Sequence, residues 1–185
     1  MPPMNRRDAV RTTAVFVGGL LLTSNGLVLA CARETERPLA NRVLSADDQA
    51  LAEDIAETLL PTTVASPGAR AAGAGATMNL LLSDCYEPEQ QVRVVNGLKE
   101  LRATCDAKFG RAFAALTTAE REQLLREIDA TALRSKGHYF ELVRDLADRS
   151  YFSSEIGMTK ARRWTLEPGK WVGCVPLQPG QPAWA

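Results

Sequence analysis

The sequence predicts an all-α protein: a compact bundle of five or six helices followed by an extended C-terminal tail rich in Pro, Gly and Trp. Three observations support this. Apolar residues recur at helical spacing in successive segments, several segments begin with helix-capping residues, and no stretch alternates apolar and polar residues for long enough to predict a strand. The composition, 45% hydrophobic and 24% charged, is that of an ordinary globular domain.

The first predicted helix follows Ser45, whose side chain can cap its N-terminus. Two aspartates stand in the first turn, where the helix dipole favours negative charge. The apolar face comprises Leu51, Ile55 and Leu59, and Pro61 ends the helix. Residues 62–76 are a loop rich in Gly and Pro. Gly73 and Gly75 do not make a phosphate-binding loop, because no strand precedes them and no Gly-Lys-Ser/Thr follows.

A short buried helix is expected over residues 77–86, and a long amphipathic helix from Pro88 to about Lys108, ended by Gly110. The apolar face of the long helix is predicted from the spacing of Val92, Val95, Leu98, Leu101, Cys105 and Phe109. Thr117 and Glu120 form a capping box that begins the next helix. A further helix carries Tyr139, Phe140, Val143, Leu146 and Ala147, and a last one is expected from Ser154 to about Trp164.

The C-terminal tail, which includes Trp171 and Trp184, is interrupted too often by Pro and Gly to be helical. It is also too apolar for a solvated tail. We expect it to lie extended across the bundle or against another protein.

Residues 1–32 have the three parts of an export signal, residues 33–44 read as a linker, and residues 45–185 as the helical domain. Arginines precede a segment, residues 12–32, that contains no charge. A retained membrane-spanning helix is the alternative, but Gly, Thr, Ser and Asn dilute this segment below the strongly apolar ~20 residues that a span requires.

Arg6 and Arg7 resemble the pair of the twin-arginine export motif, S/T-R-R-x-F-L-K, with Asn5, Ala9 and Arg11 as departures from it. The partner that this motif implies is the twin-arginine translocase. The end of the signal can be cut in two ways. V-L-A-C, ending at Cys31, resembles a lipobox in which Cys31 becomes lipidated, whereas A-C-A at residues 30–32 is an ordinary signal-peptidase site. Both predict a periplasmic protein, membrane-associated if lipid-anchored.

The rest of the sequence contains no recognisable catalytic or metal-binding motif. The formal net charge is zero, which argues against nucleic acid as a partner. His138, the only histidine, is expected at the surface or at a helix start, and Cys85, Cys105 and Cys174 are too scattered for a zinc site. The carboxylates of the first helix are expected on solvated faces. We therefore assign no catalytic, cofactor-binding or metal-ligating residue to this chain.

The three cysteines after Cys31 allow at most one disulfide, and we favour Cys85 with Cys174, which would tie the tail to the bundle. The alternative is that all three are small buried apolar residues.

Several segments together resemble one family. They are L-L-S-D-C-Y-E-P-E-Q-Q from Leu81, Y-F-S-S-E-I-G-M-T-K-A from Tyr151, P-G-K-W-V-G-C-V-P-L from Pro168 and the closing P-A-W-A. They resemble the gluconate 2-dehydrogenase subunit 3 family, the small subunits of membrane-bound FAD-dependent sugar and polyol dehydrogenases. The second segment is similar to the family pattern G-Y-F-T-S-E-I-G-A-T, with Ser150 and Met158 as departures.

The resemblance implies a non-catalytic subunit. FAD would be bound by a partner, a large subunit of the glucose–methanol–choline (GMC) type, and haem c by a third subunit, a multihaem cytochrome c. The small chain would bind the large subunit and escort its folded export. The alternative function is a stand-alone envelope lipoprotein that binds a small ligand or a protein.

The expected contact surface for the large subunit comprises aromatic and neighbouring residues of the second segment and the tail. These residues are Tyr151, Phe152, Glu155, Ile156, Gly157, Trp171 and Trp184. The alternative is that Tyr151, Phe152 and Trp164 fill the core of the bundle itself.

Overall fold

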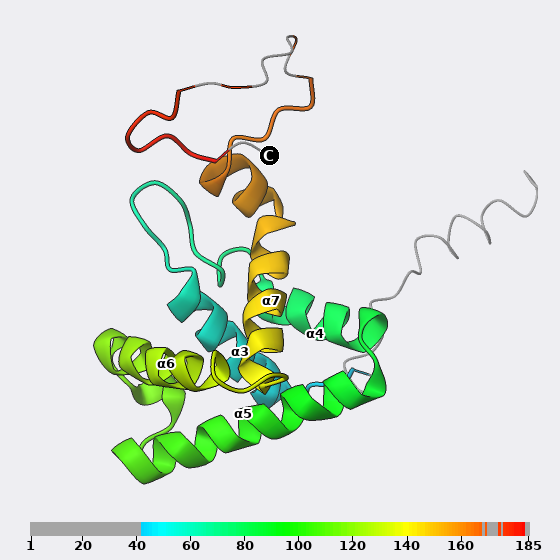
Figure 1. Ribbon diagram of the computed structural model, residues 1–185, viewed down its shortest axis with the longest axis vertical. Coiled ribbons are helices and arrows are strands. Elements are labelled where there is room, and N and C mark those ends of the chain that lie inside the picture. The colour runs from blue at the N-terminus through cyan, green and yellow to red at the C-terminus, as the bar shows by residue number, and fades with distance from the viewer. Residues whose placement is uncertain (1–41, 168, 170–173, 175, 184–185) are drawn as a thin grey trace, which may run out of the picture. The chain divides into compact units, whose positions relative to one another are not determined.

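The computed structural model describes residues 42–167, 169, 174 and 176–183 (Figure 1). Five α-helices follow one another: α3 (Ala46–Leu59), α4 (Ala74–Cys85), α5 (Pro88–Phe109), α6 (Thr118–Ala132) and α7 (Tyr139–Phe152). A 3-10 turn, η2 (Phe113–Ala115), precedes α6, and a π-helical turn, η3 (Gly157–Ala161), follows α7. No β-strand occurs in these residues, so the all-α prediction is confirmed.

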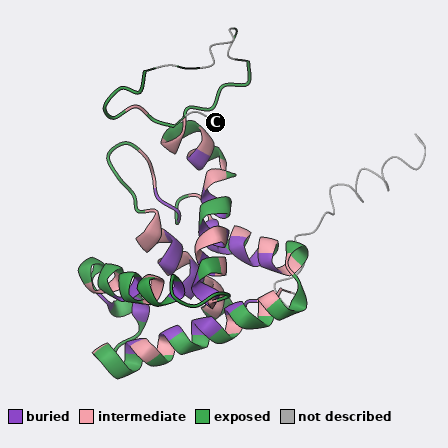
Figure 2. Ribbon diagram, in the orientation of Figure 1, coloured by how far each residue is buried: buried purple, intermediate pink, exposed green. Residues whose placement is uncertain are grey.

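Helix α7 is the centre of the bundle, since α3, α4, α5 and α6 all pack against it. Its buried face includes Phe140, Val143 and Leu146, and it meets Leu98 and Leu101 of α5 in one hydrophobic core. Figure 2 shows this burial as purple bands on the helix faces that point inward. Removing these side chains from water is the main force that holds the helices together.

The predicted helix ends are confirmed where they depend on capping residues within one turn of the helix end. The Ser45 hydroxyl accepts a hydrogen bond from the Asp48 backbone amide at 3.1 Å. Thr117 and Glu120 make the expected capping box, and Gly110 ends α5 with a φ of 62°. Helix α4 begins three residues before the expected position, at Ala74, because Gly73 adopts the left-handed conformation there with a φ of 65°.

Two expectations about helical segments were wrong in part. On α5 the buried valine is Val94, whereas Val92 is 59% exposed. Val94 shares a face with Leu98 and Leu101, and a face through these residues turns Val92 outward. The last helix was expected to reach Trp164, but η3 ends at Ala161 because the next residue, Arg162, has extended backbone.

The tail residues that the structure describes are not helical, as predicted. Gln181 donates from its backbone amide to the Gln178 carbonyl at 3.0 Å, which closes a turn over Pro179 and Gly180. The chain then returns to η3, where the Arg163 amide donates to the Ala183 carbonyl at 2.8 Å.

Asp48 makes the stability of the fold vary with pH in the acid range. Burial alone would raise the pKa of this carboxyl, but hydrogen bonds from Arg102 at 2.5 Å and Ser45 at 2.8 Å outweigh it and lower the pKa. A lowered folded-state pKa stabilises the fold above the unfolded-state pKa of about 3.9, and the stabilisation is lost as pH falls below it.

We therefore expect the free energy of unfolding, measured with urea from about pH 6 to pH 2, to fall less steeply for Asp48→Asn than for the unmodified chain. Parallel curves would show that Asp48 is not ion-paired in solution.

Candidate partner-binding surface

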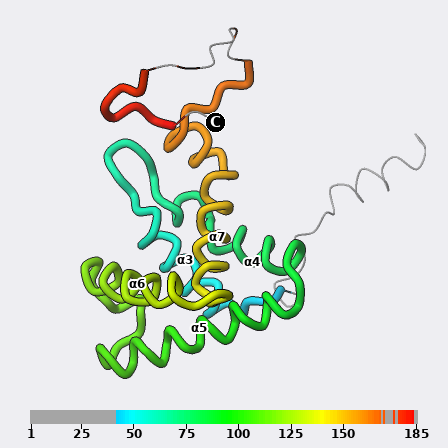
Figure 3. Tube along the Cα trace, in the orientation of Figure 1, coloured from blue at the N-terminus to red at the C-terminus, as the bar shows by residue number. Residues whose placement is uncertain are grey.

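Of the residues predicted to contact a partner, those that the structure describes lie around the C-terminal end of α7 (Figure 3), and they differ in accessibility. Tyr151 is buried, in agreement with the alternative that this residue fills the core of the bundle. Its hydroxyl donates to the Pro67 carbonyl at 2.7 Å and lies 2.7 Å from the Ser66 hydroxyl. Tyr151 therefore joins α7 to the loop between α3 and α4, which the sequence did not indicate.

Phe152 is half-buried and forms an edge-to-face pair with Tyr151, with ring centroids 5.0 Å apart. The Arg162 guanidinium lies over the Phe152 ring, 4.3 Å from the ring centroid. This cation–π contact fixes the chain that leaves η3 against α7. Ile156 is half-buried and Glu155 is exposed, so both are accessible on the surface around Phe152.

Gly157 has a structural role that only glycine can fill. A Cβ atom at this position would lie 2.0 Å from the Tyr151 carbonyl oxygen and 2.9 Å from the Phe152 Cα. The Ser154 hydroxyl links the same segment: it donates to the Tyr151 carbonyl at 2.6 Å and accepts from the Gly157 amide at 3.0 Å. The S-S-E-I-G motif therefore folds η3 tightly back onto the end of α7.

Exposed apolar side chains follow η3. Trp164 is 46% exposed and Leu166 is 77% exposed. Trp164 therefore does not fill the core, and it is available for a partner. Trp171 and Trp184, which the sequence also suggested as contacts, lie outside the described residues.

The export and lipidation residues, Arg6, Arg7 and Cys31, also lie outside the described part of the chain. Cys85 and Cys174 are both exposed free thiols in the structure, and a disulfide between them stays a prediction. Cys105 is buried in α5, and burial raises the pKa of its thiol, which keeps it protonated and unreactive.

The polar residues that we considered for chemistry have structural partners. His138 is the N-cap of α7, as expected for a helix-start residue, and its Nδ1 accepts from the Phe140 amide at 3.2 Å. Among residues 42–167 and the described tail, no three His, Cys, Asp or Glu side chains are grouped so that they could hold a metal ion.

An open pocket of about 370 Å³ lies between the C-terminal end of α3, α6 and α7. Its apolar floor includes Leu125 and Phe140. The charges at its rim neutralise each other in pairs, Arg144 with Asp129 at 2.6 Å and Arg126 with Glu122 at 3.5 Å.

No helix in the described segments is both long enough and apolar enough to cross a bilayer. A search of curated proteins and of solved structures finds no match to this chain. The sequence model of one family, described as Gluconate 2-dehydrogenase subunit 3, matches residues 46–169, from the first residue of α3 to just beyond η3. The match covers all five helices and the S-S-E-I-G turn, and it confirms the resemblance seen in the sequence: the chain belongs to the gluconate 2-dehydrogenase subunit 3 family.

Proposed function

We propose that this chain is a non-catalytic accessory subunit of a periplasmic, membrane-associated dehydrogenase that oxidises sugars or polyols. It binds the FAD-containing large subunit of the GMC type, and a multihaem cytochrome c is an optional third subunit that would accept the electrons. The observation that carries the proposal is the family match over residues 46–169. The accessible Phe152, Ile156 and Trp164 at the end of α7 give such a subunit aromatic and aliphatic contacts of the kind that anchor protein interfaces.

The second part of the proposal is escort. A flavoprotein binds FAD as it folds in the cytoplasm, so it has to cross the membrane folded, which is what the twin-arginine translocase does. If the large subunit has no signal of its own, it crosses bound to this chain, whose Arg6 and Arg7 provide the signal. The alternative, a stand-alone envelope lipoprotein, has no need for folded export.

Changing Arg6 and Arg7 together to Lys should leave the large subunit in the cytoplasm. The translocase recognises the arginine pair rather than positive charge alone, so lysines should not replace it. The measurement is dye-linked dehydrogenase activity and FAD in periplasmic and cytoplasmic fractions.

Arg11→Lys is the matched control, because it alters a neighbouring positive charge and makes the motif more similar to the twin-arginine pattern. Export should then continue. A large subunit that still reaches the periplasm when both Arg6 and Arg7 are lysine would show that it is not escorted.

Gentle detergent extraction of the tagged chain separates the two functions. The accessory role predicts a yellow complex that contains a flavoprotein, with or without haem bands. A colourless monomer supports the stand-alone lipoprotein, and the mass of its N-terminal peptide would show whether Cys31 is lipidated.

A further inference from the structure

The loop between α3 and α4, residues 61–69, is a fixed projection rather than a simple connection. At its base the Ala69 amide donates to the Leu60 carbonyl at 2.9 Å, and near its tip the Thr63 amide donates to the Ser66 carbonyl at 2.9 Å. Val64 and Ala65 are the tip, and both are exposed. Figure 1 shows the loop extending beyond the end of α3, toward the same end of the described domain as η3.

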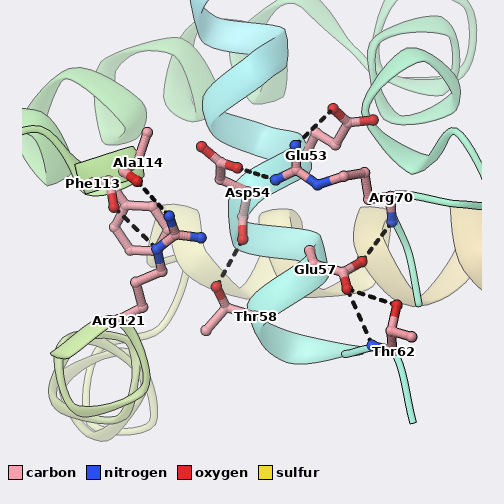
Figure 4. A network of polar contacts seen from close by, with 9 residues as sticks. All are labelled: Glu53, Asp54, Glu57, Thr58, Thr62, Arg70, Phe113, Ala114 and Arg121. Atoms are coloured by element: carbon pink, nitrogen blue, oxygen red, sulfur yellow. Dashed lines mark hydrogen bonds and ion pairs between the residues drawn. The ribbon is translucent and has the colours of Figure 1, made fainter. Parts of the chain in front are cut away.

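Helix α3 fixes the two stems of this loop through Glu57 (Figure 4). One carboxylate oxygen accepts from the Thr62 amide and the Thr62 hydroxyl, each at 3.1 Å, and the other accepts from the Arg70 amide at 2.8 Å. Gly68 closes the stem: its amide donates to the Thr62 hydroxyl at 2.9 Å, and a Cβ there would lie 2.5 Å from both Glu57 oxygens. These hydrogen bonds hold the two sides of the loop at a fixed distance from each other.

Helix α7 fixes the loop from the other side, through the bonds of buried Tyr151 to Ser66 and Pro67. The hydrogen bonds thus fix the loop on both sides, while Val64 at its tip has its whole side chain in water. A fixed exposed valine contributes nothing to the stability of the isolated chain, but it lowers the ordering cost of any contact made through it.

The charges on either side of the loop favour a protein over a membrane as the occupant. Glu53, Asp54 and Glu57 lie along α3 at the stem, where the Arg70 guanidinium pairs with Glu53 and Asp54. On the other side, beyond Tyr151 and Phe152, the cations Arg162 and Lys160 outnumber the single carboxylate of exposed Glu155. An anionic bilayer would be repelled by the first side, whereas a protein surface can match both. One valine also buries too few methyl groups to anchor a chain in lipid.

We propose that the tip of this loop, Val64 with Ala65, is the primary contact of this chain with the flavoprotein large subunit, and that Val64 enters an apolar pocket of that subunit. This rests on the proposed function and specifies the surface that performs it. The rim of the partner's pocket carries basic residues opposite the α3 carboxylates and acidic residues opposite Arg162. Tyr151 acts on docking through the loop that it positions.

The test is the affinity of the purified full-length chain, as Val64→Asp, for the purified large subunit, measured by biolayer interferometry. Loss of a buried valine and burial of a charge should weaken binding about tenfold to a hundredfold. Val92→Asp on α5, another exposed valine, is the matched control and should bind normally. Circular dichroism and thermal unfolding of both variants should be unchanged, because each side chain is exposed in the folded state.

Tyr151→Phe keeps the buried ring and removes the hydroxyl that holds the loop. It should weaken binding less than Val64→Asp, and it should add little in the double variant, because both changes act through one contact.

The outcomes separate the two proposals. If the unmodified chain does not bind the large subunit, the proposed function fails and the docking surface fails with it. If the unmodified chain binds and Val64→Asp binds equally well, the function stands and the loop is not the contact. If Val64→Asp binds the large subunit normally but no longer sediments with phosphatidylglycerol vesicles, the loop contacts lipid and the inference is overturned.

Discussion

Replacing Gly97 by alanine is expected to lower the free energy of unfolding by about 3 kcal/mol, the upper part of the range for overpacking a core. Gly97 is buried where α5 crosses α7. An alanine Cβ there would lie 2.0 Å from Cγ and 2.6 Å from Cβ of Tyr139. These atoms are at the root of a buried side chain, so the ring cannot rotate away and the start of α7 would have to shift.

Urea unfolding measures this effect, and Asn96→Ala, at the exposed neighbouring position of α5, is its control. Asn96→Ala should be neutral or slightly stabilising, because alanine has the higher helix propensity. Tyr139→Ala removes the ring atoms but leaves the Cβ, so in the double variant Gly97→Ala should cost clearly less than it does alone. A fully stable Gly97→Ala would mean that α5 and α7 do not approach each other this closely in solution.

The sequence predicted those parts of the fold whose causes are local. The capping box of Thr117 and Glu120, the Ser45 cap and the Pro88 start each depend on residues within one turn, and all lie where expected. The orientation of α5 about its own axis was harder, because hydrophobicity alone treats Val92 and Val94 alike. The close approach of Tyr139 to Gly97 is one tertiary contact that favours burial of the face with Val94.

The sequence located the candidate surface, but it did not show which of its residues are buried and which are accessible to a partner. The Y-F-S-S-E-I-G segment indicated the region, yet Tyr151 is buried while Phe152 is half-buried. The fixed loop at 61–69 was read only as a Gly- and Pro-rich connection. Its second support, Tyr151, lies 85 residues from Ser66 in the chain, and no periodic or capping pattern records such a contact.

Asn79 was also missed, although the sequence contained a signal for it. It is a polar residue within an apolar helical run, three residues before buried Leu82, and so it lies on the face that points into the core. Its side chain is fully buried and acts as a backbone partner: Oδ1 accepts from the Leu44 amide and Nδ2 donates to the Leu44 carbonyl, both at 3.0 Å. Nδ2 also donates to the Gln49 side-chain oxygen at 2.9 Å.

Asn79→Leu is therefore expected to lower the free energy of unfolding by about 2–4 kcal/mol, although leucine has a similar size and is more apolar. Leu44 is itself buried, so its amide and carbonyl would be left without partners in a medium of low dielectric constant. Urea unfolding gives the loss, and Asn96→Leu on the exposed face of α5 should change stability by only a few tenths of a kcal/mol.

Hydrogen exchange distinguishes the cause of this loss from a simple packing defect. The Leu44 amide should lose its protection in Asn79→Leu, while the Val43 amide should keep part of its own, because it donates to the Ser83 hydroxyl at 3.1 Å instead. A packing defect would lower protection throughout α4 and leave Leu44 no worse than its neighbours. Selective loss at Leu44 would show that a single amide side chain attaches the segment before α3 to α4.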